Sequence, residues 1–337
     1  MHDPKLTAYI IRLNPASTCA EPSNRWLFRC LIQKANSVAL EDSFIYMEAF
    51  RKLLKKLDQQ QMYADTTSKK CMTAHQPNLI DPSVEPNIKP YPSSNIIAGR
   101  VEGGSFGRKR NKTSTLNKTN RSAIAKDDAI TDDFYFLLYT PLDSIKSILL
   151  LQSYSDDSID AVMKKFFKEF FVCSGQFAKP GIERFVPEVI INDFKDGAVI
   201  SNFTFSSEVP SETLLDEPVL QSKLPFKVTV KIEASSNGLT YDEFKAANDS
   251  IQRIPFARRL TLGIFSSKKG SLKDKRTGKT TPFDISDNFE IQPTIQLSKY
   301  LELTGGPADF ALIHEYCIQL LESIKLEIYM QNAVQER

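Results

Sequence analysis

Residues 132–154 read DDFYFLLYTPLDSIKSILLLQSY, and this stretch decides the fold class. Two nearly continuous apolar runs, 134–139 and 147–151, are separated by the turn residues Pro141, Leu142 and Asp143. Strands without polar alternation are typical of the centre of a sheet whose two faces are both covered. We therefore predict two adjacent strands here, in the middle of a sheet.

The preceding segments extend this pattern toward the N-terminus as a β-meander. NIIAGRVEG (95–103), GSFGRKRNKT (104–113) and NRSAIAKDD (120–128) are three more strand candidates at a spacing of roughly ten residues. Gly103-Gly104, Asn117 and Asp127-Asp128 mark the breaks between them. Because these strands are more polar than 132–154, we expect them toward an edge of the sheet.

The N-terminal part predicts two strands and one helix. The strands are 6–13 and 26–32, and the helix is 43–58, with apolar residues at spacings of three and four. Residues 59–94, rich in Gln, Ser, Asp and Pro, are predicted to form a long connection.

The C-terminal part repeats the mixture. A helix over 155–171 has a wide phenylalanine-rich face. Strands are then predicted at 186–194, 198–207, 226–234, 258–267 and around 283–297, with a turn-rich run at 267–281 and helices at 241–251 and 308–330.

These elements predict an α+β fold of mainly antiparallel β-meander sheets packed with a few amphipathic helices. We divide the chain into an N-terminal strand and helix segment (1–60), a proline-rich connection (61–94), a β-meander plus helix (95–175), and a C-terminal α+β region ending in a long helix (176–337). The last two segments can form one continuous domain.

Composition is that of an ordinary globular protein, with 41% hydrophobic and 25% charged residues. The five cysteines are odd in number and widely spaced, which is not the pattern of a disulfide framework. No apolar run approaches the roughly 18–20 residues that span a bilayer, and the N-terminus does not resemble a signal peptide. We expect a cytoplasmic protein that does not contact a membrane.

The net charge of +2 conceals two basic clusters. Residues 100–126 carry eight basic side chains against Glu102, and residues 266–283 carry six against Asp274. Phosphates are common partners of such surfaces, so we predict DNA or RNA binding by a set of basic residues: Arg100, Arg108, Lys109, Arg110, Lys112, Lys118, Arg121, Lys268, Lys269, Lys273, Lys275, Arg276 and Lys279. An acidic protein partner is one alternative, and lysines that keep sheet edges soluble are another.

The sequence offers little material for catalysis. Its three histidines are His2, His75 and His314. Of these, His314 lies three residues before Cys317, and this pair by itself makes half a metal site. Motifs of the HExxH, GxSxG and zinc-ribbon types do not occur. We therefore predict no catalytic residue, no metal and no cofactor, and we favour a non-enzymatic role.

A nuclease remains an alternative, because it needs only a few converging carboxylates and a metal ion. The candidates are Asp127, Asp128, Asp132 and Asp133, together with Glu233 beside Lys231.

The stretch from Asp132 to Ile159 resembles a segment of uncharacterised bacterial proteins carried on mobile elements and in anti-phage defence loci. In both, an aromatic-rich strand, a proline turn and an apolar strand ending in Gln lead into a helix. With the preceding Gly-rich meander included, between Ile97 and Phe171, the resemblance covers about 60 residues. It contains no catalytic motif, and it implies a role in defence without implying a mechanism.

Three functional hypotheses follow. The first is a non-catalytic accessory or sensor component of a bacterial anti-phage defence system that binds nucleic acid or another polyanion through the two basic segments. The second is a metal-dependent nuclease or toxic effector. The third is a scaffold subunit, self-associating or binding a partner protein from the same locus, with apolar surface on the last helix.

Overall fold

The chain forms two compact units in the computed structural model. Unit 1 comprises residues 1–185 and 296–337, and unit 2 comprises residues 186–295. These boundaries lie elsewhere than the segment boundaries predicted at 60, 94 and 175. The structure describes residues 4–33, 40–74, 87–117, 119–154, 157–210, 225–234, 238–257, 260–275, 280–286, 290–302 and 309–330. Its antiparallel sheets and packed helices confirm the α+β class.

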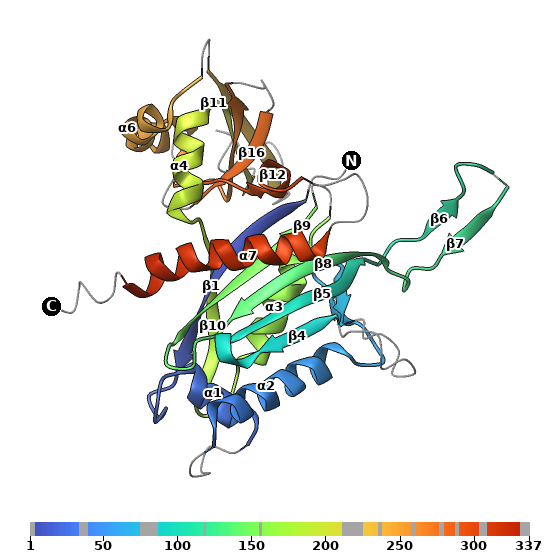
Figure 1. Ribbon diagram of the computed structural model, residues 1–337. Coiled ribbons are helices and arrows are strands. Elements are labelled where there is room, and N and C mark those ends of the chain that lie inside the picture. The colour runs from blue at the N-terminus through green and yellow to red at the C-terminus, as the bar shows by residue number, and fades with distance from the viewer. Residues whose placement is uncertain are drawn as a thin grey trace. The chain divides into compact units, whose positions relative to one another are not determined.

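Unit 1 is built on an antiparallel sheet of order β10-β1-β9-β8-β5-β3-β2, in which β4 shares with β3 one edge of β5 (Figure 1). The strands are β1 (Lys5–Pro15), β2 (Tyr63–Asp65), β3 (Lys70–Thr73), β4 (Ile88–Tyr91), β5 (Ile96–Ser105), β8 (Ile130–Tyr139), β9 (Lys146–Ser153) and β10 (Phe177–Phe185). The helices are α1 (Asn24–Leu31), α2 (Asp42–Leu57), α3 (Asp160–Phe170) and α7 (Phe310–Lys325), with short helical turns η1 (Pro92–Ser94), η3 (Leu297–Lys299) and η4 (Leu326–Met330).

Strands β8 and β9 lie in the middle of this sheet, as their apolar sequence predicts. Phe134, Phe136 and Leu138 are fully buried and face the layer of α1, α2 and α3. Tyr135 and Leu137, which alternate with them, are also buried and face α7 on the other side of the sheet (Figure 1). The prediction that both faces of these central strands are covered is therefore confirmed.

Helix α7 buries its apolar side against this sheet. It packs against β5 and β8, and its buried residues are Ile313, Cys317, Leu320, Leu321 and Ile324. Burying one such aliphatic side chain contributes about 1.5–3 kcal/mol. The apolar surface of the last helix, on which the scaffold hypothesis depended, is thus largely used inside unit 1.

Strands β6 (Arg110–Thr113) and β7 (Arg121–Ile124) form a two-stranded hairpin of their own. It leaves the sheet after β5, returns at β8, and projects away from the rest of unit 1 (Figure 1). The predicted strands 104–113 and 120–128 are therefore shorter than expected and do not join the edge of the main sheet.

Three other predictions in unit 1 need correction. Residues 26–32 were expected as a strand but belong to α1, whose first turn is capped by the Ser23 side chain accepting from the Trp26 N–H at 3.1 Å. The predicted connection 59–94 contains β2, β3 and β4, while its residues 75–86 lie outside the described part. Helix α3 begins at Asp160 rather than near 155.

Unit 2 has a five-stranded sheet of order β12-β11-β15-β16-β17. Its elements are α4 (Glu188–Gly197), β11 (Ala198–Pro210), β12 (Pro225–Glu233), α6 (Tyr241–Gln252), β13 (Pro255–Ala257), β14 (Leu260–Thr261), η2 (Leu262–Ile264), β15 (Ser267–Asp274), β16 (Thr280–Ile285) and β17 (Ile291–Gln292). Strand β18 (Ile295–Gln296) lies at the boundary of the units. Phenylalanines 203, 205, 244, 265 and 283 dominate the core of unit 2.

The errors in unit 2 have local causes. Of the strand predicted at 186–194, residues 188–194 belong to α4. Of the strand predicted at 258–267, the described residues 260–267 are strand only at 260–261 and 267. The run 267–281, expected to be turns, contains β15, which pairs with β11 and β16. Within that strand Gly270 leaves room for the Phe283 ring, because a Cβ there would be 2.1 Å from the ring.

No helix in the described parts of the chain combines the length and the apolar character that crossing a bilayer requires.

Candidate functional site

The first candidate site is the hairpin of residues 107–126, which we call the arm. At its base the Gly107 N–H donates to the Lys126 carbonyl at 2.9 Å, and the preceding Phe106 N–H donates to the Lys69 carbonyl at 3.1 Å. Gly107 has a φ of +92°, a conformation that glycine adopts without strain. These bonds fix the point at which the chain turns out of the main sheet.

The register of the arm places basic side chains on both of its faces. Arg110 lies across from Ile124 and Lys112 lies across from Ser122, so both cations share one face. Arg121 lies across from Thr113 on the opposite face. A positive side chain is therefore presented whichever face of the ribbon meets a partner.

The arm is uncovered along its length. Arg108, Lys109, Arg110, Lys112 and Arg121 are all exposed. Within the described part of the chain, their side chains make no hydrogen bond, ion pair or ring contact. The tip carries Leu116, which is 97% exposed. Lys118, also predicted as a binding residue, lies outside the described residues.

Arg100 differs from the residues of the arm because its side chain is held by the protein itself. Its guanidinium donates to the Asn87 side-chain oxygen at 2.7 Å and lies 3.5 Å from an Asp133 carboxylate oxygen. It also stacks over the Phe310 ring, 5.2 Å from the centroid. The structure therefore places Arg100 with α7 and β4 instead of with the arm.

The second basic segment is in unit 2, on β15 and just after it. Lys268 is only 6% exposed and lies on the core side of the sheet. Lys269, Lys273 and Lys275 are exposed. Arg276 and Lys279 lie outside the described residues. The strand thus separates side chains that the sequence grouped together.

Carboxylates accompany the exposed lysines of this sheet. Lys269 lies directly across from Asp284 on β16. On the neighbouring strands Lys227 lies across from Glu208, and Lys231 forms an ion pair with Glu233 at 2.5 Å. This face therefore has mixed charge, in contrast to the arm.

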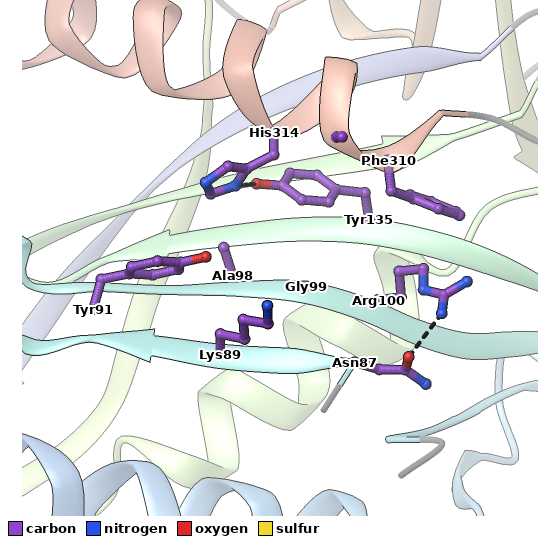
Figure 2. Close-up of a pocket in the computed structure, with 10 residues that line it drawn as sticks. Asn87, Lys89, Tyr91, Ala98, Gly99, Arg100, Tyr135, Phe310 and His314 are labelled. Carbon is purple, nitrogen blue, oxygen red and sulfur yellow. Dashed lines mark hydrogen bonds between the residues drawn. The ribbon is translucent and has the colours of Figure 1, made fainter. Parts of the chain in front are cut away.

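The second candidate site is a pocket of about 380 Å³ between the sheet of unit 1 and the first turns of α7. We call it the α7 pocket (Figure 2). Its lining comes from β4 and the residue before it, from β5 and β8, and from α7. It consists of Asn87, Lys89, Tyr91, Ala98, Gly99, Arg100, Tyr135, Phe310, Ala311 and His314. The strand residues meet because of the register of the sheet: Lys89 on β4 pairs with Ala98 on β5, which pairs with Leu137 on β8. Residues two positions away from these three along each strand point to the same face of the sheet.

Aromatic rings order one end of the α7 pocket. The Tyr135 hydroxyl and His314 Nδ1 are 2.6 Å apart, a hydrogen bond whose direction depends on the tautomer of the histidine (Figure 2). The His314 ring stacks on Tyr91 with centroids 5.7 Å apart and an angle of 25°. The histidine is thus a structural link between α7, β4 and β8.

Burial and charge shift the ionisation of this end of the pocket. Burial, and secondarily the positive charge of Lys89, lower the pKa of His314 below its usual 6.5. Burial raises the pKa of Tyr135, so its hydroxyl stays protonated. Cys317, the sequence candidate for a metal ligand beside His314, is completely buried, and burial raises its pKa as well.

The carboxylates considered for a nuclease do not converge. Asp132 and Asp133 are adjacent on β8, so their side chains point to opposite faces of the sheet. Asp128 accepts a hydrogen bond from the Ala125 N–H at 2.7 Å at the base of the arm. Glu233 pairs with Lys231 in unit 2. Among the described residues, no group of three His, Cys, Asp or Glu side chains is arranged to hold a metal ion.

Sequence reasoning identified the arm and missed the α7 pocket. The arm is visible as a local charge run, whereas the pocket combines residues near position 90 with others near 135 and 310. Lys89 and Tyr91 fell in the segment interpreted as a connection, and no local signal joins them to His314.

The chain matches no protein-family model and no curated protein sequence. Its function is therefore inferred from the geometry of these two sites.

Proposed function

We propose that this protein binds nucleic acid through the arm and does no chemistry on it. The observation that carries the proposal is an uncovered two-stranded ribbon with basic side chains on both faces and no carboxylate between Gly107 and Lys126. A two-stranded hairpin alone is marginally stable in water. A partner that neutralises its charge would stabilise it.

The dimensions of the arm suit a nucleic-acid groove. The major groove of B-DNA, about 12 Å wide, admits a two-stranded β-ribbon. A ribbon with cations on both faces can contact the phosphates of both strands while it lies between them. The exposed Leu116 at the tip offers an apolar contact to the thymine methyl groups that line this groove.

The second basic segment supports this proposal less than the arm does. Lys268 is buried, and the exposed lysines of β12 and β15 share their sheet face with carboxylates. An acidic protein partner remains the main competitor for the arm, and the experiment below distinguishes it. The finer hypothesis, an accessory or sensor component of a bacterial anti-phage defence assembly, rests on the resemblance of residues 132–159.

The test reverses the charge of Arg108, Lys109 and Arg110 by replacing all three with Glu. Binding of duplex DNA, single-stranded DNA and RNA would be measured by fluorescence anisotropy over a range of salt concentrations. We expect the variant to lose binding and its melting temperature to stay close to that of the parent, because no buried contact changes. If variant and parent bind alike in low salt, the proposal fails.

The matched control is Lys269, Lys273 and Lys275 replaced by Glu in unit 2, which changes the net charge by the same amount. We expect it to retain most of the binding. Replacing the three arm residues with Ala gives the magnitude: for duplex DNA each phosphate contact contributes about 0.9 to the slope of log K against log salt, so the slope should fall by about 2.7. If the natural partner of the arm is an acidic protein instead, binding to duplex DNA should not show this change in salt slope.

A further inference from the structure

The α7 pocket lies apart from the arm and has its own chemistry. It is bounded by β4 and β5 on one side and by the first turns of α7 on the other (Figure 2). Arg100 is on β5, and five further strand residues and Phe106 separate it from the start of the arm, about 20 Å at 3.3 Å per residue. A ligand in the pocket is therefore not in contact with the ribbon of the arm.

The pocket is lined by two cationic side chains, of which Arg100 also pairs with Asp133 outside the lining. Lys89 and Arg100 are both among the ten lining residues, and none of the ten is a carboxylate. Within the described part of the chain, Asn87 and Asp133 engage two of the five N–H donors of Arg100, which leaves donors for a ligand. Burial lowers the pKa of His314, and the charge of Lys89 lowers it further.

The pocket also contains flat apolar surfaces. Tyr91 is 37% exposed, and its ring stacks on that of His314 at the edge of the pocket. Phe310 fixes the Arg100 guanidinium from one side. A volume of about 380 Å³ lies within the range of small-molecule sites, which is roughly 300–1,000 Å³.

Cations beside an exposed aromatic ring are the features that recognise a phosphate attached to a planar base. We propose that the α7 pocket binds a nucleoside monophosphate, with the phosphate between Lys89 and Arg100 and the base stacked on Tyr91. The same chemistry occurs in a free nucleotide and at the 5′-phosphorylated end of a nucleic-acid strand.

The experiment is calorimetric titration of the full chain with AMP, GMP, CMP and UMP, and with adenosine and inorganic phosphate as the separate halves of the ligand. We expect at least one nucleotide to bind more tightly than both halves. Arg100→Gln and Lys89→Gln should each weaken that binding by about tenfold or more, because each removes a charge-assisted contact. Tyr91→Leu should weaken nucleotide binding and leave phosphate binding unchanged.

The arm variant with Glu at positions 108, 109 and 110 should bind the nucleotide as the parent does, so this result is separate from the proposed function. Titration with a short 5′-phosphorylated oligonucleotide and its 5′-hydroxyl counterpart then identifies the source of the ligand. The proposal is overturned if no nucleotide binds better than phosphate or adenosine. It is overturned equally if folded Lys89→Gln and Tyr91→Leu variants bind as the parent does.

Discussion

Excision of the arm is the most direct test of its structural independence. Residues 108–125 would be removed and Gly107 joined to Lys126 through Asn-Gly. The two ends are suited to this change because the Gly107 N–H already donates to the Lys126 carbonyl at 2.9 Å. Asn-Gly is a preferred sequence for such a two-residue turn.

The expected effect on stability follows from burial. No described side chain between residues 108 and 125 is buried, so the deletion exposes little apolar surface. The hydrogen bonds lost are mainly those between β6 and β7, which both leave with the arm. Shortening the connection from about 18 residues to about 2 lowers its closure entropy cost by about 1–2 kcal/mol. The shortened chain should be as stable as the parent or slightly more stable.

Thermal unfolding followed by circular dichroism measures this, and anisotropy with labelled DNA and RNA measures binding on the same samples. At about 2–4 °C per kcal/mol for a domain of this size, the melting temperature should stay the same or rise by a few degrees, while nucleic-acid binding is lost. A fall of more than about 5 °C would refute the reasoning, because it would mean that the arm packs against the rest of unit 1.

Two further predictions concern the body of unit 1. Gly104→Ala should destabilise the fold by about 2 kcal/mol or more, because the new Cβ would lie 1.8 Å from the Ile130 carbonyl oxygen. Gly181→Ala, whose Cβ would have nothing within 4 Å, should be close to neutral in the same urea titration. Equal unfolding midpoints for the two variants would contradict the close approach of β5 and β8. Stability should also decrease as pH falls below about 6.5, because the lowered pKa of His314 means that the unfolded chain takes up its proton first. His314→Gln should reduce that loss when unfolding is measured at pH values from about 7 to 5, and an unchanged pH profile would argue against the buried Tyr135–His314 contact.

Each of the two sites carries one of the two functional proposals. The arm offers cations on a projecting ribbon and has no group that could activate a nucleophile. The α7 pocket offers cations and aromatic rings, and its only histidine is engaged by Tyr135. Together the two proposals describe a protein that would contact a nucleic acid at one place and a small phosphorylated ligand at another.

Helices and strands were predictable where the pattern was long or unambiguous. The apolar runs of β8 and β9 indicated central strands, and the periodicity over 43–58 indicated α2, which spans Asp42–Leu57. Residues 26–32 and 186–194 were assigned incorrectly because a short apolar run has no distinguishing period. In α1 the Ser23 side chain caps the first turn and so favours a helix. In α4 the first turn is closed by the Ile190 and Ile191 N–H groups, which both donate to the Pro187 carbonyl.

How well each site could be predicted depends on how far apart its residues lie in the sequence. The arm was found because its charges are contiguous, although its shape was not expected, since the sequence cannot show whether a polar strand joins a sheet or leaves it. Lys268 was included in the binding set because alternation on β15 was hidden by residues typical of turns. That strand exists because β11 and β16 pair with it on both sides.

By itself, the sequence determined the fold class, the covered centre of the main sheet and the concentration of positive charge in 107–126. These depend on local composition and on periods of two and 3.6 residues, which a chain carries before it folds. Tertiary structure alone decided that the charged segment projects as an arm, that α7 closes the second face of the sheet, and that Lys89, Arg100 and His314 line one pocket. Such features depend on pairing between segments far apart in the chain, and that pairing is set by the packing of the whole unit.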